Sequence, residues 1–169
     1  MPYALARGSR YSCYPCPLCT ILCLLSSKAS RGALCGNVSP QLSWNGAPAG
    51  TTSFALTMYD PDAPTGSGFW HWLIMNIPPA AKELPKGSGK PGASGLPAGS
   101  LQTRTDFGTP GYGGPCPPKG DKPHHYQFTL FAVGMDKLPV DENTSGAVAG
   151  FNLHFHTLAK ATFTATYGR

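Results

Sequence analysis

Two acidic residues and a histidine lie in one short segment between two apolar runs. Asp60 and Asp62 follow the apolar run 53–59 (SFALTMY), and His71 stands just before the run 72–77 (WLIMNI). The prolines of the Asp-Pro-Asp-Ala-Pro turn fix φ near about −65° and remove backbone donors, so the backbone that carries the carboxylates is stiff. Such a turn can form for purely local reasons, and this segment alone leaves a plain acidic turn and a functional site equally open.

A second polar segment stands at the start of a third apolar run. His124 and Tyr126 precede the run 127–133 (QFTLFAV), and two residues that are two apart share one face of a strand. If these strands lie in one sheet, His71 and His124 converge beside Asp60. A carboxylate favours the protonated form of a nearby imidazole, and a phenol adds a neutral donor. The sequence therefore predicts a small pocket that accepts an anion.

A glycine-rich loop comes before this second segment. Residues 111–114 (GYGG) can adopt backbone angles that other residues disfavour, and they can bring backbone N–H groups close to a ligand. We interpret this loop, including Gly113, as one wall of the pocket. Cys116 follows in Pro-Cys-Pro-Pro and is expected to be a small, partly buried apolar residue. As a nucleophile it would need a neighbouring base, for which His124 is the candidate.

These motifs resemble the phosphatidylethanolamine-binding protein family, and in particular its bacterial, Raf kinase inhibitor-like branch. The resemblance rests on the Asp-Pro-Asp-Ala-Pro turn, the Trp-His-Trp strand start, the Gly-Tyr-Gly-Gly-Pro-Cys-Pro-Pro loop and the His-His-Tyr strand entry. The segment 37–44 (NVSPQLSW) and the C-terminal segments 156–161 and 166–169 also match, so the resemblance covers residues 37–169.

The resemblance implies a mainly β fold, a sandwich of two sheets with a C-terminal helix and long loops. It also implies that the Ala63–Pro64 bond is cis. The family has His-Arg-Tyr where this chain has His-His-Tyr, and strand alternation points His125 away from the pocket. Together, the resemblance and the glycine loop predict a ligand-binding pocket formed by Asp60, Asp62, Pro64, Phe69, His71, Gly113, His124 and Tyr126.

Composition and charge are consistent with a loop-rich β domain. The chain is 41% hydrophobic and 12% charged, with 21 glycines and 18 prolines. Its formal charge of +5 is concentrated in residues 1–36, which carry four basic residues and no acidic one. Residues 37–169 are nearly neutral, at +1, and lack the basic stripe that nucleic-acid binding needs.

Residues 1–36 are expected to form a divergent, truncated or misread segment outside the domain 37–169. Their apolar run 18–27 is shorter than the about 20 residues that span a bilayer. Two alternatives stay open for this segment: a secretion signal, and a metal or iron–sulfur site at Cys13, Cys16, Cys19 and Cys23. A cytoplasmic location is the default, because 37–169 contains a single cysteine and so no internal disulfide.

The remaining pattern predicts five strands and one helix. Apolar runs predict strands at 38–44, 53–59, 72–77, 127–133 and 161–167, and residues 78–107 form a long irregular connection with at most one helical turn at 80–84. The helix should begin near Asn143 or Thr144. Apolar residues recur in this helix at steps of three and four and should form one apolar stripe, made of Val148, Phe151, Phe155 and Leu158.

Three classes of function follow, with binding favoured. The first is capture of a small anion such as phosphate or a phospholipid head group; the second is a kinase-regulating interaction protein acting independently of the pocket. The third is a hydrolase that uses His71 or His124 as base, or Cys116 as nucleophile, but no serine elbow and no suitably spaced metal ligands accompany these residues.

His154 and His156 lie about 200° apart on a helix and cannot share an ion. We therefore expect no enzyme activity, cofactor or metal.

Overall fold

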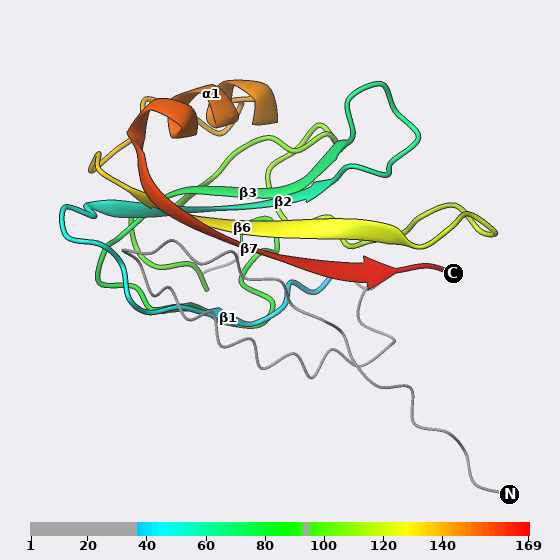
Figure 1. Cartoon of the computed structure of the whole chain (residues 1–169), viewed down its shortest axis with the longest axis horizontal. Helices are drawn as coiled ribbons and strands as arrows, with labels where there is room; N and C mark the ends of the chain where they lie inside the picture. Colours follow the sequence, from blue (N-terminus) through cyan, green and yellow to red (C-terminus); the bar gives the residue numbers. More distant parts are fainter. Residues whose placement is uncertain (1–36, 93–94) are drawn as a thin grey trace, which may run out of the picture.

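The structure is a computed structural model that describes residues 37–92 and 95–169. A five-stranded sheet has the order β5-β3-β2-β6-β7, and β1 pairs with β4 in a small second sheet; all of these pairings are antiparallel. Helix α1 lies over one face of the large sheet, and β1 lies across the other face (Figure 1). The predicted mainly β architecture of two sheets with a C-terminal helix is confirmed. The elements are β1 (Leu42–Ser43), β2 (Ser53–Asp60), β3 (Phe69–Ile77), β4 (Glu83–Leu84), β5 (Leu101–Gln102), β6 (His124–Val133), α1 (Gly146–His156) and β7 (Thr157–Tyr167).

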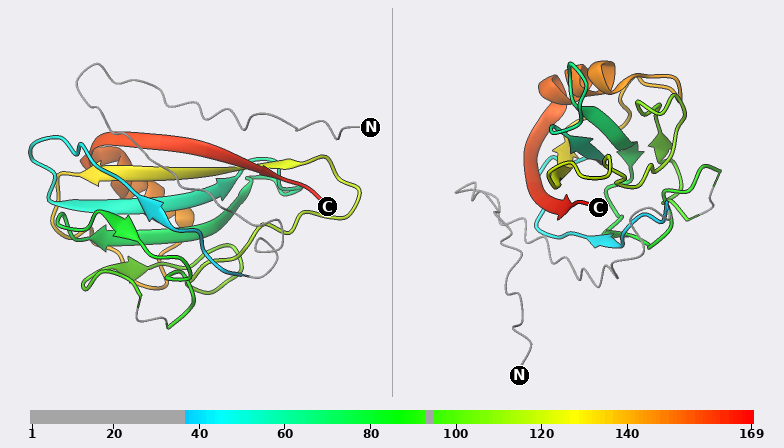
Figure 2. Two further views of the ribbon diagram at one scale, coloured as in Figure 1. Left: turned by 90° about the horizontal axis from the view of Figure 1, so that it is seen from below. Right: turned by 90° about the vertical axis from the view of Figure 1, so that its right-hand side faces the viewer.

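Two apolar layers hold these elements together. Between the sheets, Trp44 and Leu42 pack against buried side chains of β2, β3 and β6, such as Phe54. Between the large sheet and α1, a second cluster includes Leu73 and Leu153. Because β2 and β3 are covered on both faces, their side chains are buried almost throughout, which explains their continuous apolar runs, whereas buried residues of β6 alternate with more exposed ones. Figure 2 shows the two sheets and α1, between which these side chains lie, from two further directions.

The central strands begin earlier than the apolar runs suggested. β3 starts at Phe69 and β6 at His124, so the polar residues that precede each run belong to the strands. β2 lies between β3 and β6 in the sheet, which satisfies the condition on which the predicted pocket depends. β7 follows α1 directly and pairs with β6 along its length.

Several local predictions are wrong. Residues 83–84 form strand β4 paired with β1, in place of a helical turn at 80–84. The described residues contain no cis peptide bond, so the Ala63–Pro64 bond is trans. Cys116 is exposed, because the proline-rich segment that carries it runs along the surface of the cavity described below.

Helix α1 differs from prediction at its start and in the face it buries. The N-cap is Ser145, whose side-chain oxygen accepts a hydrogen bond from the Val148 N–H at 3.4 Å. Gly146 and Ala149 face the sheet together with Leu153, because the ring of Trp70 lies directly against Gly146 and leaves room only for small side chains. The predicted apolar stripe is therefore exposed, with relative exposures of 50, 66 and 64% at Val148, Phe151 and Phe155. Leu158, predicted as the fourth residue of this stripe, is 50% exposed and lies beyond the end of α1, in β7.

Within 37–92 and 95–169, no helix combines the length and the apolarity needed to cross a bilayer. The expectations for residues 1–36, which include the secretion signal and the cysteine cluster, lie outside the described residues.

Candidate ligand-binding site

A cavity of about 980 Å³ opens where β2 ends and β3 and β6 begin. The acidic turn after β2, the first residues of β3 and β6, and the loops around residues 90 and 105–118 surround it. Of the eight residues predicted to form the pocket, seven line this cavity: Asp60, Pro64, Phe69, His71, Gly113, His124 and Tyr126.

A β-bulge in β3 turns His71 towards the cavity. Met58 of β2 pairs with Trp72, and the next residue, Tyr59, pairs with Trp70, so His71 is an extra residue without a direct partner in β2. Trp70 packs on the α1 side of the sheet and Trp72 on the other side, where the cavity lies. The extra residue breaks strict alternation, and this places His71 on the cavity side next to Trp72.

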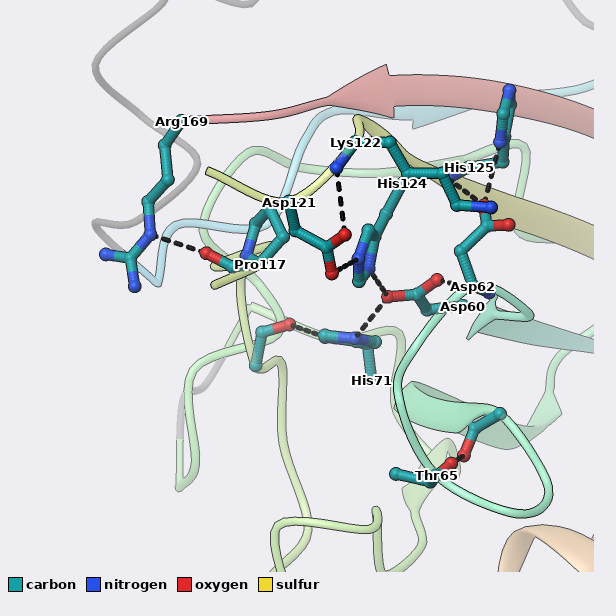
Figure 3. A network of polar contacts seen from close by, with 12 residues as sticks. Asp60, Asp62, Thr65, His71, Pro117, Asp121, Lys122, His124, His125 and Arg169 are labelled. Atoms are coloured by element: carbon teal, nitrogen blue, oxygen red, sulfur yellow. Dashed lines mark hydrogen bonds and ion pairs between the residues drawn. The ribbon is translucent and has the colours of Figure 1, made fainter. Parts of the chain in front are cut away.

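The ring of His124 lies between two carboxylates (Figure 3). Its Nδ1 is 2.7 Å from Oδ2 of Asp60, and its Nε2 is 3.2 Å from Oδ2 of Asp121. Burial alone lowers the pKa of His124, but the hydrogen bonds to Asp60 and Asp121 outweigh it and hold the pKa above its usual value. Since an ionised carboxylate can only accept, these two contacts together favour the doubly protonated imidazolium form of His124.

His71 is held in the opposite protonation state. Its Nδ1 is 2.9 Å from the carbonyl oxygen of Gly113, which fixes the proton on Nδ1, and the Gly113 N–H donates to the His71 carbonyl at 2.9 Å. Burial lowers the pKa of His71, against the opposing effects of this hydrogen bond and of Asp60. The Nε2 atom, 3.9 Å from Oδ2 of Asp60, is then a neutral acceptor that faces the same carboxylate as His124.

Aromatic rings form the rest of the wall near the histidines. Phe107 lies 4.8 Å from Phe69 and 5.4 Å from His71, and Tyr126 lies 5.3 Å from His71, measured between ring centroids. The Phe107 ring lies so close to Gly113 that a Cβ atom there would displace it from this wall. The polar groups are therefore set in a largely apolar frame, as in many small-molecule sites.

Comparison with known proteins confirms the family that the sequence motifs resemble. The sequence profile of the phosphatidylethanolamine-binding protein family matches residues 23–168. The chain belongs to this family. It is 54% identical to the UPF0098 protein YbcL of Escherichia coli over 132 residues, which are 78% of this chain and 72% of YbcL, and 54% identical to E. coli YbhB over 131 residues, 78% of this chain and 82% of YbhB. The crystal structure of E. coli YbcL superposes with a TM-score of 0.78 over 79% of this chain and 82% of that chain.

Asp62, the eighth residue predicted for the phosphatidylethanolamine-binding protein pocket, is not brought into the cavity. Its Oδ2 accepts from the His125 backbone N–H at 2.8 Å and from His125 Nδ1 at 2.7 Å. The hydrogen bond to the His125 side chain is the main reason that the pKa of Asp62 is lowered. The His125 side chain is 57% exposed, so this pair lies on the outer surface of the strand entry, as strand alternation predicted for position 125.

The sequence reasoning missed several residues of the site. Asn37, Lys90 and Phe107 all line the cavity. The side-chain oxygen of Asn37 also accepts a hydrogen bond from the Gly114 N–H at 2.9 Å. Lys90 and Phe107 come from the long connection after β3, whose path no local pattern indicates. Asp121 could have been found, because a carboxylate three residues before a histidine in a proline-rich turn lies within its reach.

Among the described residues, no group of three or more His, Cys, Asp or Glu side chains is arranged to hold a metal ion.

Proposed function

We propose that this chain binds a phosphate-containing head group, and that a zwitterionic group such as phosphoethanolamine fits the cavity best. The family supports a binding role in general, and the nature of the ligand is inferred from the charges. The observation that carries the proposal is the position of His124, a cavity residue that is 1% exposed and lies between two carboxylates, which favour a positive charge on its ring.

The charges around this imidazolium favour a ligand that carries both signs. Asp60 and Asp121 contribute two negative charges against the one positive charge of His124, while His71 is neutral. Lys90 lines the cavity with an exposed side chain and offers a second positive charge. A phosphate can meet the positive groups, while an ammonium can meet the carboxylates or the faces of Phe69 and Phe107.

Binding accounts for the arrangement better than catalysis does. A general base needs a free lone pair, and both nitrogens of His124 are engaged as donors to carboxylates. His71 keeps a lone pair on Nε2, because Gly113 holds its proton on Nδ1, but this nitrogen faces the Asp60 carboxylate at 3.9 Å. We also propose a cytoplasmic location, on the ground that Cys116 is the one cysteine of residues 37–169.

Titration calorimetry of phosphoethanolamine and of inorganic phosphate tests the proposal. The proteins are the wild type, His71→Gln, His124→Gln and the matched control His154→Gln, which changes an exposed histidine on α1. We expect phosphoethanolamine affinity to fall by about tenfold or more in the two cavity variants, the usual effect of losing one charged or polar ligand contact. The control should bind as the wild type does, and near-UV circular dichroism checks the fold of each protein. Equal affinities in all four folded proteins would reject the proposal.

A further inference from the structure

Asp121 occupies the nitrogen of His124 that points away from Asp60. The two contacts, 2.7 Å to Asp60 and 3.2 Å to Asp121, leave no ring N–H of His124 for a ligand (Figure 3). An anion that approaches His124 therefore meets an imidazolium whose hydrogen bonds are already made. Asp121 does not itself line the cavity, but its carboxylate occupies the Nε2 hydrogen bond that a phosphate oxygen would need in order to bind His124.

The two carboxylates differ in how firmly they are held. The Asp60 side chain is 3% exposed, and its Oδ1 also accepts from the Asp62 N–H at 2.9 Å. The Asp121 side chain is 36% exposed, and its Oδ1 accepts from the N–H of Lys122, the next residue, at 2.9 Å. If Asp121 moved away from His124, water could solvate its carboxylate. If Asp60 lost its contact with His124, its carboxylate would remain buried without a charged partner. Asp121 is thus the replaceable partner of His124.

We propose that Asp121 determines the ligand specificity of the site, by competing with the phosphate group of a ligand for the positive charge of His124. This inference rests on the proposed function and deepens it. A bare phosphate ion must bind beside two carboxylates with one imidazolium to offset them. The ammonium of phosphoethanolamine gives the displaced carboxylate a cationic partner, so Asp121 penalises the bare anion more than the zwitterion.

The test compares Asp121→Asn with the wild type and with Asp136→Asn. Both variants remove one negative charge from an exposed side chain, but Asp136 lies on the turn after β6, at the far end of that strand from His124. Calorimetry at pH 7 and about 0.15 M salt measures the dissociation constants of inorganic phosphate and phosphoethanolamine for each protein. NMR titration of the His124 imidazole in the same three proteins reports whether Asp121 contacts it in solution.

We expect Asp121→Asn to bind inorganic phosphate about tenfold more tightly, as for one repulsive charge removed a few ångströms from the ligand, and to bind phosphoethanolamine with a smaller gain. The pKa of His124 should fall in this variant, because the hydrogen bond to Asp121 raises it, and both results should be absent in Asp136→Asn.

Two kinds of failure are distinguishable. Unchanged phosphate affinity, an equal gain for both ligands, or an unchanged pKa of His124 overturns the role of Asp121, while phosphoethanolamine binding that depends on His71 and His124 still upholds the proposed function. If neither ligand binds to the wild type or to Asp121→Asn, the proposed function fails and the inference with it. Phosphate binding by Asp121→Asn alone would support the inference strongly.

Discussion

His124 combines burial with a positive charge, and this combination is tolerated only because two carboxylates surround it. Asp60 alone, with its 3% exposed side chain, would be a buried negative charge without His124. Removing one member of such a pair costs more than the pair contributes, since the other charge stays desolvated. The contact between His124 and Asp60 therefore also stabilises the junction between the end of β2 and the start of β6.

This coupling predicts how stability depends on pH. The folded-state pKa of His124 lies above its unfolded value, so the stabilisation is fully present below about pH 6.5 and is lost as the pH rises through the folded-state pKa. We expect His124→Gln to lower the free energy of unfolding by about 3 kcal/mol at pH 6, and by less at pH 8.5. Urea unfolding of both proteins across this range measures the difference. A difference that stays constant or grows with pH would contradict a charged His124 in the fold.

At the scale of the elements, the sequence predicts the four long strands but not the bulge that orients His71. Apolar runs identify β2, β3 and β6 because most of their residues are buried, and β7 is identified although its residues are only half-buried or exposed. The bulge that orients His71 depends on how β3 registers against β2, which a single strand's pattern does not contain. Alternation counted back from Trp72 would have pointed His71 to the wrong face.

The buried face of α1 was mispredicted for a related reason. Large residues at three- and four-residue steps suggested the face with Phe151 and Phe155, yet small residues pack against the sheet because Trp70, Leu73 and Met75 already fill that surface. Hydrophobic periodicity predicts that a helix has an apolar face, but shape complementarity with the neighbouring layer decides which face is buried.

Two substitutions on α1 test this packing. Leu153 is 2% exposed, and Leu153→Ala should lower the free energy of unfolding by about 3 kcal/mol through lost burial and a cavity. Phe151 is 66% exposed, and Phe151→Ala should change the free energy of unfolding by less than about 1 kcal/mol. Chemical denaturation of the two variants and the wild type gives both values. If Phe151→Ala were the more destabilising change, the helix would pack on the face that the sequence pattern suggested.

On the scale of the whole molecule, the site joins segments that are distant in the chain but gathered at one end of the large sheet. Asn37, the first described residue, closes one wall by accepting from the Gly114 N–H at 2.9 Å, and the other walls come from residues up to Tyr126. The motifs predicted which side chains converge because neighbouring antiparallel strands bring their ends together. The contributions of Asn37 and Phe107 follow from loop paths that depend on the completed fold.

This gathering predicts that the described domain carries the binding activity without residues 1–36. A chain that begins at Asn37 keeps every described residue that lines the cavity, so its dissociation constant for phosphoethanolamine should stay within about threefold of the full chain. Asn37→Ala in the full chain should weaken binding more than that truncation, because it leaves the Gly114 N–H without its acceptor and loosens the wall next to Gly113. Calorimetry compares the three proteins, with circular dichroism as the control for folding. The opposite result would be a truncated protein that folds but does not bind, together with an Asn37→Ala protein that still binds. That result would place an essential part of the site in residues 1–36 and would show that the cavity of the described domain is incomplete.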